Sequence, residues 1–266
     1  MTTLNSLMNL SGRRALITGA CGGLGRVMAQ TLAELGAELV LLDLADTPLA
    51  ELAAEIKADW GVDVVVRHCD LESQAERVTL IAGLQQEGRL DILINNAAFV
   101  GTSDLQGWAT PFEQQSIETW RRALEVNLTA VFHLCQGLAP IIQLSGHGSI
   151  INIGSIYGEY GPDWRLYEGT SMSNPAAYSA TKAGILQLTR WLSTTMAPMV
   201  RVNSISPGGI IRGQAQVFVE RYEARTPLER MATEDDFRGV VAFLATDMSK
   251  YMTGQNILID GGWGVW

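Results

Sequence analysis

Short apolar runs that are rich in β-branched residues recur along the chain, with amphipathic stretches between them. The runs are Ala15–Thr18, Glu38–Asp43, Val62–Val66, Asp91–Asn95, Ser149–Ile153, Arg201–Ile205 and Asn256–Asp260. Nearly continuous apolar runs of this length are typical of parallel strands that are buried on both faces. The pattern therefore predicts seven strands.

The stretches between these runs have the apolar spacing of helices. They predict helices at about 24–36, 47–60, 72–87, 116–144, 175–196 and 234–246. Because strand and helix alternate throughout residues 1–266, we expect a single α/β domain with a doubly wound, parallel, seven-stranded sheet. Ligands of such sheets bind at the carboxyl ends of the strands. Two irregular stretches, Ala98–Ser116 and Ile156–Asn174, follow strands and are expected to shape a substrate pocket there.

The composition narrows the classes of partner. Of 266 residues, 47% are hydrophobic and 18% are charged, which supports one well-buried core, and the net charge of −9 disfavours nucleic acid and anionic membranes. Cys21, Cys69 and Cys135 lie far apart, with no Cys-x-x-Cys pair and no nearby histidine at metal-ligand spacing, so we expect neither disulfides nor a metal site. With no signal sequence and no apolar run of about 20 residues, the expectation is a cytoplasmic protein without membrane spans.

A glycine-rich turn lies between the first predicted strand and the first predicted helix. Its sequence is Thr18-Gly19-Ala20-Cys21-Gly22-Gly23-Leu24-Gly25. Glycines let the backbone approach a pyrophosphate closely, and the free N–H groups at a helix start attract negative charge. An ordinary tight turn explains the glycines equally well in isolation. The position after the first strand favours a dinucleotide-binding Rossmann fold.

Asp43 ends the second predicted strand, 18 residues after Gly25. A carboxylate at this place accepts hydrogen bonds from the ribose hydroxyls of adenosine and repels a 2′-phosphate. This predicts NAD rather than NADP as the cofactor, although Asp43 could instead cap the following turn. Asp70, at the end of the third strand region, is a candidate for the adenine edge.

Four polar residues form the candidate catalytic set. Tyr178 and Lys182 are four residues apart on a predicted helix and share a face, Ser155 follows the fifth strand, and Asn127 lies within the long helix 116–144. Each has an ordinary structural explanation: a solvated helix face, a turn, or a local hydrogen bond. One shared site explains all four together.

The order and spacing of the motifs are specific as a set. They are Thr18-Gly19-x3-Gly23-x-Gly25, Asp70, Asn95-Asn96-Ala97, Asn127, Ser155, Tyr178-x3-Lys182, Pro207-Gly208 and Asp260-Gly261-Gly262. Across essentially the whole chain this series resembles the short-chain dehydrogenase/reductase family. The resemblance implies an NAD-dependent oxidoreductase acting on a CH–OH group.

What the resemblance implies for each catalytic residue can be stated as chemistry. Tyr178 would exchange a proton with the substrate oxygen, and the Lys182 ammonium would favour the phenolate and hold the nicotinamide ribose. Ser155 would position the substrate oxygen, and Asn127 would support a water chain to solvent. The implied cofactor-binding residues are Gly19, Gly22, Gly23, Leu24, Gly25, Asp43, Asp70, Leu71, Asn96, Ala97, Tyr178, Lys182, Pro207, Gly208, Ile210 and Arg212.

Two departures from the family pattern concern the substrate. Ser155 and Tyr178 are 23 residues apart, more than is usual, so the chain has an insertion at about 158–173. This loop either closes over a polar substrate or is a surface elaboration or subunit contact. Arg212 stands where the family often has Thr, and its guanidinium could pair with the cofactor diphosphate or with an acidic group of the substrate. The candidates for substrate contact are Tyr157, Arg165 and Arg212.

These features lead to the hypothesis of an acidic or phosphorylated, polyhydroxylated, sugar-like substrate. The insertion, with Tyr167-Glu168-Gly169-Thr170, also resembles a subgroup found in bacterial surface-sugar and flagellin-glycan biosynthesis. Polyol dehydrogenases of the gluconate type share most of the same motifs.

Other functions remain open at this point. A non-catalytic NAD-binding regulatory protein would keep the fold without turnover, and an epimerase or dehydratase would use NAD transiently. The four intact catalytic positions favour an enzyme with net hydride transfer. The resemblance implies a homotetramer or homodimer, and Trp263 and Trp266 near the C-terminus lie either at a subunit interface or folded back on the core.

Overall fold

The computed structural model describes residues 2–99 and 105–266. All seven predicted strands are present, each within two residues of its predicted start and end: β1 (Arg14–Thr18), β2 (Glu38–Asp43), β3 (Val64–His68), β4 (Ile92–Asn95), β5 (Gly148–Ile153), β6 (Val200–Pro207) and β7 (Asn256–Ile259). They pair in parallel in the order β3-β2-β1-β4-β5-β6-β7. The predicted doubly wound α/β sheet is confirmed, and its strand order reverses between β1 and β4.

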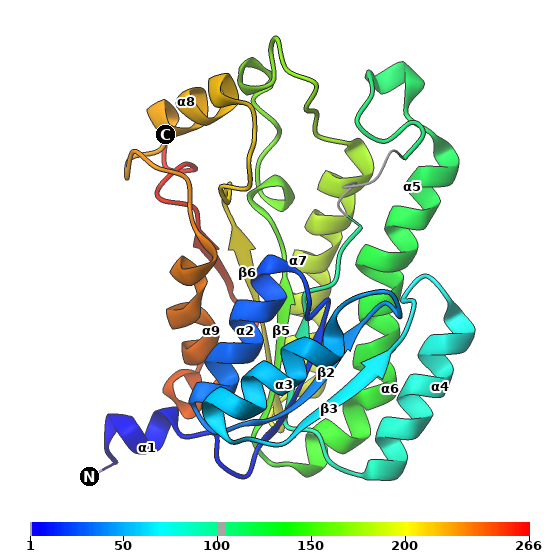
Figure 1. The fold of residues 1–266 in the computed structure, drawn as a ribbon, viewed down its shortest axis with the longest axis vertical. Coiled ribbons are helices and arrows are strands. Elements are labelled where there is room, and N and C mark those ends of the chain that lie inside the picture. Colours follow the sequence, from blue (N-terminus) through cyan, green and yellow to red (C-terminus); the bar gives the residue numbers. More distant parts are fainter. Residues whose placement is uncertain (1, 100–104) are drawn as a thin grey trace.

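Helices cover both faces of the sheet (Figure 1). One face carries α2 (Gly23–Glu34), α3 (Leu49–Trp60) and α9 (Arg238–Ala245), and the other carries α4 (Gln74–Glu87), α6 (Ala130–Leu144) and α7 (Ala176–Met196). Each set buries its apolar stripe against one side of the strands, which explains the nearly continuous apolar runs in the sequence.

The predicted helix 116–144 is not continuous. It consists of α5 (Ile117–Leu124), a π-helical turn (Glu125–Thr129) and α6. Asn127 lies in the π turn, where its side chain bonds to the backbone of Phe99 and to Thr181 rather than facing solvent. A single π turn within an α-helix is a frequent feature of functional sites.

Three further helical features differ from the predictions. The segment 234–246 begins as a 3-10 turn (Glu234–Phe237), with Thr233 and Asp236 as a capping box, and continues as α9. The sequence pattern missed α1 (Leu4–Met8) and α8 (Gln216–Arg225). The irregular stretch Ala98–Ser116 contains a 3-10 turn (Phe112–Gln114), and its residues 100–104 lie outside the described residues.

The predicted insertion packs against α8 and the C-terminal residues, and Figure 1 shows α8 and the C-terminus at the same end of the molecule. Trp263 is only 1% exposed, with its ring stacked on Tyr222 at 6.1 Å and beneath the Arg225 guanidinium at 4.3 Å. Trp263 is therefore covered by residues of its own chain, whereas Trp266 is 72% exposed. Of the two alternatives, the tail folds back on its own core.

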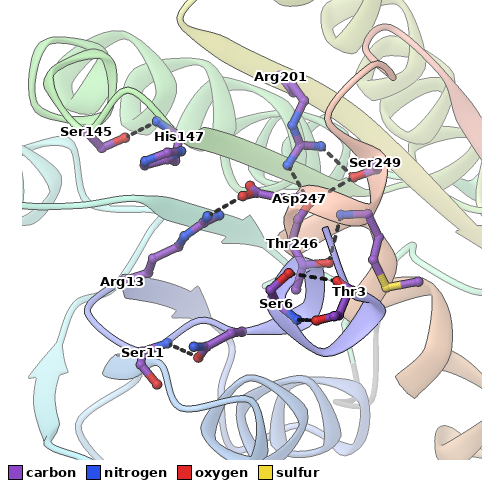
Figure 2. Close-up of polar contacts among 12 residues, drawn as sticks. Thr3, Ser6, Ser11, Arg13, Ser145, His147, Arg201, Thr246, Asp247 and Ser249 are labelled. Carbon is purple, nitrogen blue, oxygen red and sulfur yellow. Dashed lines mark hydrogen bonds and ion pairs between the residues drawn. The ribbon is translucent and has the colours of Figure 1, made fainter. Parts of the chain in front are cut away.

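The opposite end of the sheet is tied together by polar contacts (Figure 2). Arg13, just before β1, forms an ion pair with Asp247 at 2.9 Å. Arg201 of β6 donates to the Ser249 hydroxyl at 2.7 Å and to the Leu244 carbonyl at 3.0 Å. These contacts join the amino ends of β1 and β6 to the segment before β7. No helix within residues 2–99 and 105–266 has the length and apolar character needed to cross a bilayer.

Candidate active site

The glycine turn forms a cradle that only glycine can build. Gly19 has a φ of +64°, and a Cβ there would lie 2.9 Å from the Ala97 Cα. A Cβ on Gly25 would lie 2.0 Å from the Gly19 carbonyl oxygen, and one on Gly23 would lie 2.6 Å from Glu234 Oε1. α2 starts at Gly23, so the free N–H groups of its first turn open onto this cradle. The observed turn therefore fits a pyrophosphate, as the sequence predicts.

The predicted Asn-Asn-Ala turn after β4 braces the glycine turn. The Asn96 amide donates to the carbonyls of Thr18 (2.9 Å) and Gly19 (3.0 Å). The Thr18 hydroxyl oxygen accepts from the backbone N–H groups of Asn96 and Ala97, both at 3.0 Å. β1 and β4 are neighbours in the sheet, so these bonds lock the turn at the point where the strand order reverses.

Carboxylates dominate one end of the cradle. Asp43 accepts hydrogen bonds from the backbone N–H groups of Cys21 (2.7 Å) and Leu44 (2.9 Å), which fixes its side chain at the rim. Asp70 and Glu72 line the same cavity, where Arg122 is held by two hydrogen bonds to Glu72 at 2.7 and 3.0 Å. The net charge at this end is negative.

Two cavities meet at Ser155 and Tyr178, two of the candidate catalytic residues. The first, of about 760 Å³, extends from the glycine turn and Asp43 to Tyr178, and we call it the cofactor cavity. The second, of about 490 Å³, lies between the inserted segment, α8 and Tyr178, and we call it the substrate cavity. They share the lining residues Ser155, Tyr178, Pro207, Gly208 and Gln214.

Every residue predicted from the sequence to bind the cofactor lines the cofactor cavity. These residues are Gly19, Gly22, Gly23, Leu24, Gly25, Asp43, Asp70, Leu71, Asn96, Ala97, Tyr178, Lys182, Pro207, Gly208, Ile210 and Arg212. The fold thus brings residues from the ends of β1 to β6 to one edge of the sheet.

Tyr178 and Lys182 share the inner face of α7, as their spacing predicts. Burial raises the pKa of Tyr178, while the hydroxyl of Ser155 and the charge of Arg212 lower it. Burial lowers the pKa of Lys182 to about 8. The Lys182 ammonium lies 5.7 Å from the centre of the Tyr178 ring and donates to the Ile153 carbonyl at 2.7 Å. In this geometry Ser155 and Arg212 favour the phenolate, and the contribution expected from Lys182 together with the positive nicotinamide of NAD+ stays a prediction.

Asn127 is 2% exposed, and both ends of its amide are engaged. Its oxygen accepts from the Phe99 N–H at 2.5 Å, and its nitrogen donates to the Phe99 carbonyl (3.3 Å) and the Thr181 hydroxyl (3.2 Å). Asn127 therefore ties the segment after β4 to the catalytic helix. A role in proton relay stays a prediction.

The two arginines proposed as substrate contacts lie elsewhere. Arg212 lines the cofactor cavity, where its Nε donates to Glu234 at 2.9 Å beside Gly23. Arg165 pairs with Asp163 at 2.7 Å, its side chain is 77% exposed, and it lines neither the cofactor nor the substrate cavity. Tyr157, the third candidate, does line the substrate cavity.

The sequence reasoning missed several residues of the substrate cavity. Phe218 and Tyr222 on α8 lie one helical turn apart and form one wall, and Gln214 lines both cavities. The signal that could have found α8 is the apolar spacing of Phe218, Val219 and Tyr222 within an otherwise charged segment. Tyr167 and Asn174 also line the cavity; they belong to the irregular stretch Ile156–Asn174 that was expected to shape a substrate pocket, although neither was named as a substrate contact.

Comparison with known proteins agrees with this geometry. A family model described as enoyl-(acyl carrier protein) reductase matches residues 19–264. The chain is 34% identical over 255 residues to trans-4-hydroxycyclohexanecarboxylate dehydrogenase of Sinomonas cyclohexanicum, covering 93% of this chain and 91% of the relative. It is 27% identical over 259 residues to post-translational flagellin modification protein A of Campylobacter coli, covering 96% of this chain and all 100% of the relative.

A solved structure extends the likeness to three dimensions. The gluconate 5-dehydrogenase of Burkholderia cenocepacia, in complex with NADP and tartrate, superposes with a TM-score of 0.87 at 29% identity, covering 99% of this chain and 100% of that one. The match spans the sheet, the glycine turn and the catalytic helix alike. The chain belongs to the short-chain dehydrogenase/reductase family.

Proposed function

We propose that this protein transfers a hydride between NAD(H) and a secondary alcohol or ketone of a polar, sugar-like substrate. The observation that carries the proposal is the junction of the two cavities at Ser155 and Tyr178. A dinucleotide in the glycine cradle and an alcohol in the substrate cavity would meet at the same two hydroxyl groups. This arrangement is what hydride transfer coupled to proton transfer requires.

The catalytic side chains supply the proton chemistry. A bound nicotinamide dinucleotide would accept or deliver the hydride. Because burial raises its pKa, Tyr178 holds its proton at neutral pH and can donate it to a ketone oxygen. In the reverse direction the Tyr178 oxygen takes the proton of the alcohol, assisted by Ser155 and Arg212. Ser155, 4% exposed, holds the reacting oxygen in place.

The charges around the cradle support NAD over NADP. The Asp43 carboxylate is fixed by two backbone N–H groups at the end where an adenosine ribose would lie. A 2′-phosphate there would meet Asp43, Asp70 and Glu72, and the nearby Arg122 is already paired with Glu72. The Burkholderia relative was solved with NADP, so the choice of cofactor needs a direct test.

We propose a polar, sugar-like substrate without an acidic group. The acidic part depended on Arg212 and Arg165, and neither lines the substrate cavity. Two relatives are named for hydroxylated acids, a hydroxycyclohexanecarboxylate and gluconate. Their hydroxyl groups support a polar alcohol, whereas the uncharged residues that line the substrate cavity disfavour the carboxylate.

We also propose that the chain assembles as a homodimer or homotetramer. The outer faces of α6 and α7, which pack side by side, expose Phe132 (40%) and Trp191 (54%). Exposed aromatic residues on neighbouring helices are typical of subunit interfaces. Light scattering of the protein and of Trp191→Glu tests this, because the charge should reduce the measured mass.

The test of the activity uses the purified protein with NAD+ or NADH and a panel of polyols, sugars and their ketones, followed by nicotinamide absorbance. We expect Tyr178→Phe to lower kcat by about 10²- to 10⁴-fold, the usual contribution of a general acid/base. The dissociation constant of the variant for NADH should differ from that of the unaltered protein by less than about threefold. A change of that size is on the order of the error of such titrations. NADH binding without turnover of any panel member by the unaltered protein would instead favour a regulatory dinucleotide-binding protein.

A further inference from the structure

The substrate cavity is lined by uncharged groups. Among the described residues, no Asp, Glu, Lys, Arg or His lines it. Its walls combine aromatic and thioether side chains, among them Trp108, Phe218 and Met231, with uncharged polar side chains, among them Ser171, Ser173 and Gln214. A carboxylate or phosphate placed there would lose its hydration without gaining an ionic partner, which is strongly unfavourable. The cavity therefore favours a neutral substrate.

Two tyrosines form a polar cluster in this lining, beside Tyr178. The hydroxyls of Tyr157 and Tyr167 lie 2.5 Å apart, and both residues line the cavity with Tyr178. Asn174, on the same wall, accepts from the Ser179 hydroxyl at 2.7 Å through its Oδ1, and its amide opposes the rise that burial causes in the pKa of Tyr167. Because Oδ1 is engaged with Ser179, the amide NH₂ of Asn174 is the group that faces Tyr167.

The Tyr157–Tyr167 pair has one O–H group that is free to donate a hydrogen bond. Two tyrosine hydroxyls carry two protons, and only one of them lies between the two oxygens. Burial raises the pKa of Tyr157 and of Tyr167, so both stay protonated at neutral pH. One O–H group of the pair therefore remains to hydrogen-bond an oxygen atom in the cavity.

The cluster is held rigidly relative to the catalytic residues. The Tyr157 N–H donates to the Ser155 hydroxyl at 3.1 Å, so the two residues lie on one short turn. Tyr167 packs against Phe218 at 5.3 Å between ring centres, and Arg221 of α8 donates to the Glu168 carbonyl at 2.6 Å. A substrate whose reacting oxygen lies at Ser155 and Tyr178 thus meets a second, fixed hydrogen-bonding group.

Resting on the proposed function, we infer that the substrate is a neutral diol or hydroxyketone. Tyr178 and Ser155 bind the reacting oxygen, and the Tyr157–Tyr167 pair binds the second oxygen. The aromatic walls pack against the carbon atoms between them. Tyr157 and Tyr167 are specificity-determining residues, whereas Arg165 and Arg212 do not contact the substrate.

The experiment compares cyclohexanediols, cyclohexanol and 4-hydroxycyclohexanecarboxylate as substrates with NAD+. We expect kcat/KM of the unaltered protein to be at least about tenfold higher for the best diol than for cyclohexanol or the carboxylate, the effect of one buried hydrogen bond or one unpaired charge. Tyr167→Phe should lose about tenfold or more for the diol and less than about threefold for cyclohexanol. Tyr157→Phe provides a second variant of the same pair.

Tyr160→Phe is the matched control, because Tyr160 belongs to the same segment but packs on Trp263 and does not line the cavity. An unchanged NADH dissociation constant shows that each variant is folded. Equal rates with diol and cyclohexanol, a preference for the carboxylate, or an unchanged diol preference in both tyrosine variants would overturn the inference alone. Absence of turnover with every alcohol would overturn the proposed function instead.

Discussion

Lys182 is the buried charge whose replacement tests the energetics of the site most directly. Its side chain is 3% exposed, and burial lowers its pKa from 10.5 to about 8. A shift of this size corresponds to roughly 3 kcal/mol by which the charged form destabilises the folded state. Methionine has a similar length without the charge, so Lys182→Met removes this penalty and also the hydrogen bond to the Ile153 carbonyl.

The two effects oppose each other at neutral pH. Loss of the hydrogen bond costs about 1–3 kcal/mol, so the variant should be as stable as the unaltered protein or up to about 2 kcal/mol more stable. The pH dependence separates them. The folded-state pKa lies below the unfolded one, so the penalty is complete below pH 8 and disappears as the pH rises towards 10.5. The advantage of Lys182→Met should therefore shrink by about 1.3 kcal/mol between pH 7 and pH 9.

Urea denaturation of both proteins without cofactor, at pH 7, 8 and 9, measures this difference. Other titrating groups are common to both proteins and cancel in the comparison. A stability difference that stays constant over this range would refute the reasoning that Lys182 is held as a strained buried ammonium. The same variant should lose nearly all activity, because the ammonium at 5.7 Å from the Tyr178 ring is gone.

Three further predictions concern the glycine turn, the carboxylate at the cradle rim and the buried Trp263. Gly25→Ala should weaken NADH binding by at least about tenfold in a fluorescence titration, because its Cβ would lie 2.0 Å from the Gly19 oxygen, whereas Gly83→Ala, with no neighbour within 4 Å, should bind normally. Asp43→Asn should lower the ratio of the NADP+ to the NAD+ dissociation constant by about tenfold, and the exposed Asp46→Asn should leave it unchanged. Trp263→Ala should destabilise the protein by about 3–5 kcal/mol in urea denaturation, since it empties a site that is 1% exposed; a loss below 1 kcal/mol, roughly that of a surface residue, would contradict the packing.

The strands were predictable because strands that are buried on both faces consist of nearly continuous runs of apolar residues. Each strand meets its neighbours through such a run, so local pattern and tertiary structure agree. α8 was missed because its apolar residues, Phe218, Val219 and Tyr222, are separated by charged ones and are buried by the inserted segment, which lies far away in the sequence. The π turn was missed for the same reason: Asn127 bonds to Phe99, 28 residues earlier.

In the site too, features encoded by local motifs were predictable, and contacts between residues distant in the sequence were not. Residues that face the cofactor cavity belong to short motifs at strand ends, and the sequence alone places them. The partner of Arg212 is Glu234, 22 residues away, and the partner of Tyr157 is Tyr167 within an irregular segment. The local spacing of residues predicts neither pair. The hypothesis of an acidic substrate depended on the charge of Arg212, and its ion pair with Glu234 could not be predicted.

The two cavities share only five lining residues among those described, and this limits how mutations can act. The shared residues, Ser155, Tyr178, Pro207, Gly208 and Gln214, are all close to the reacting atoms. Most of the remaining substrate cavity is built by the inserted segment and α8, which pack on each other and on Trp263, and Trp108 completes it. The remaining cofactor cavity is built mainly by the strand ends and α2. Substitutions in residues 157–172 or 216–231 should therefore change which alcohol is accepted. They should also change the stability that the packing around Trp263 contributes, and they should leave the affinity for the dinucleotide unaltered.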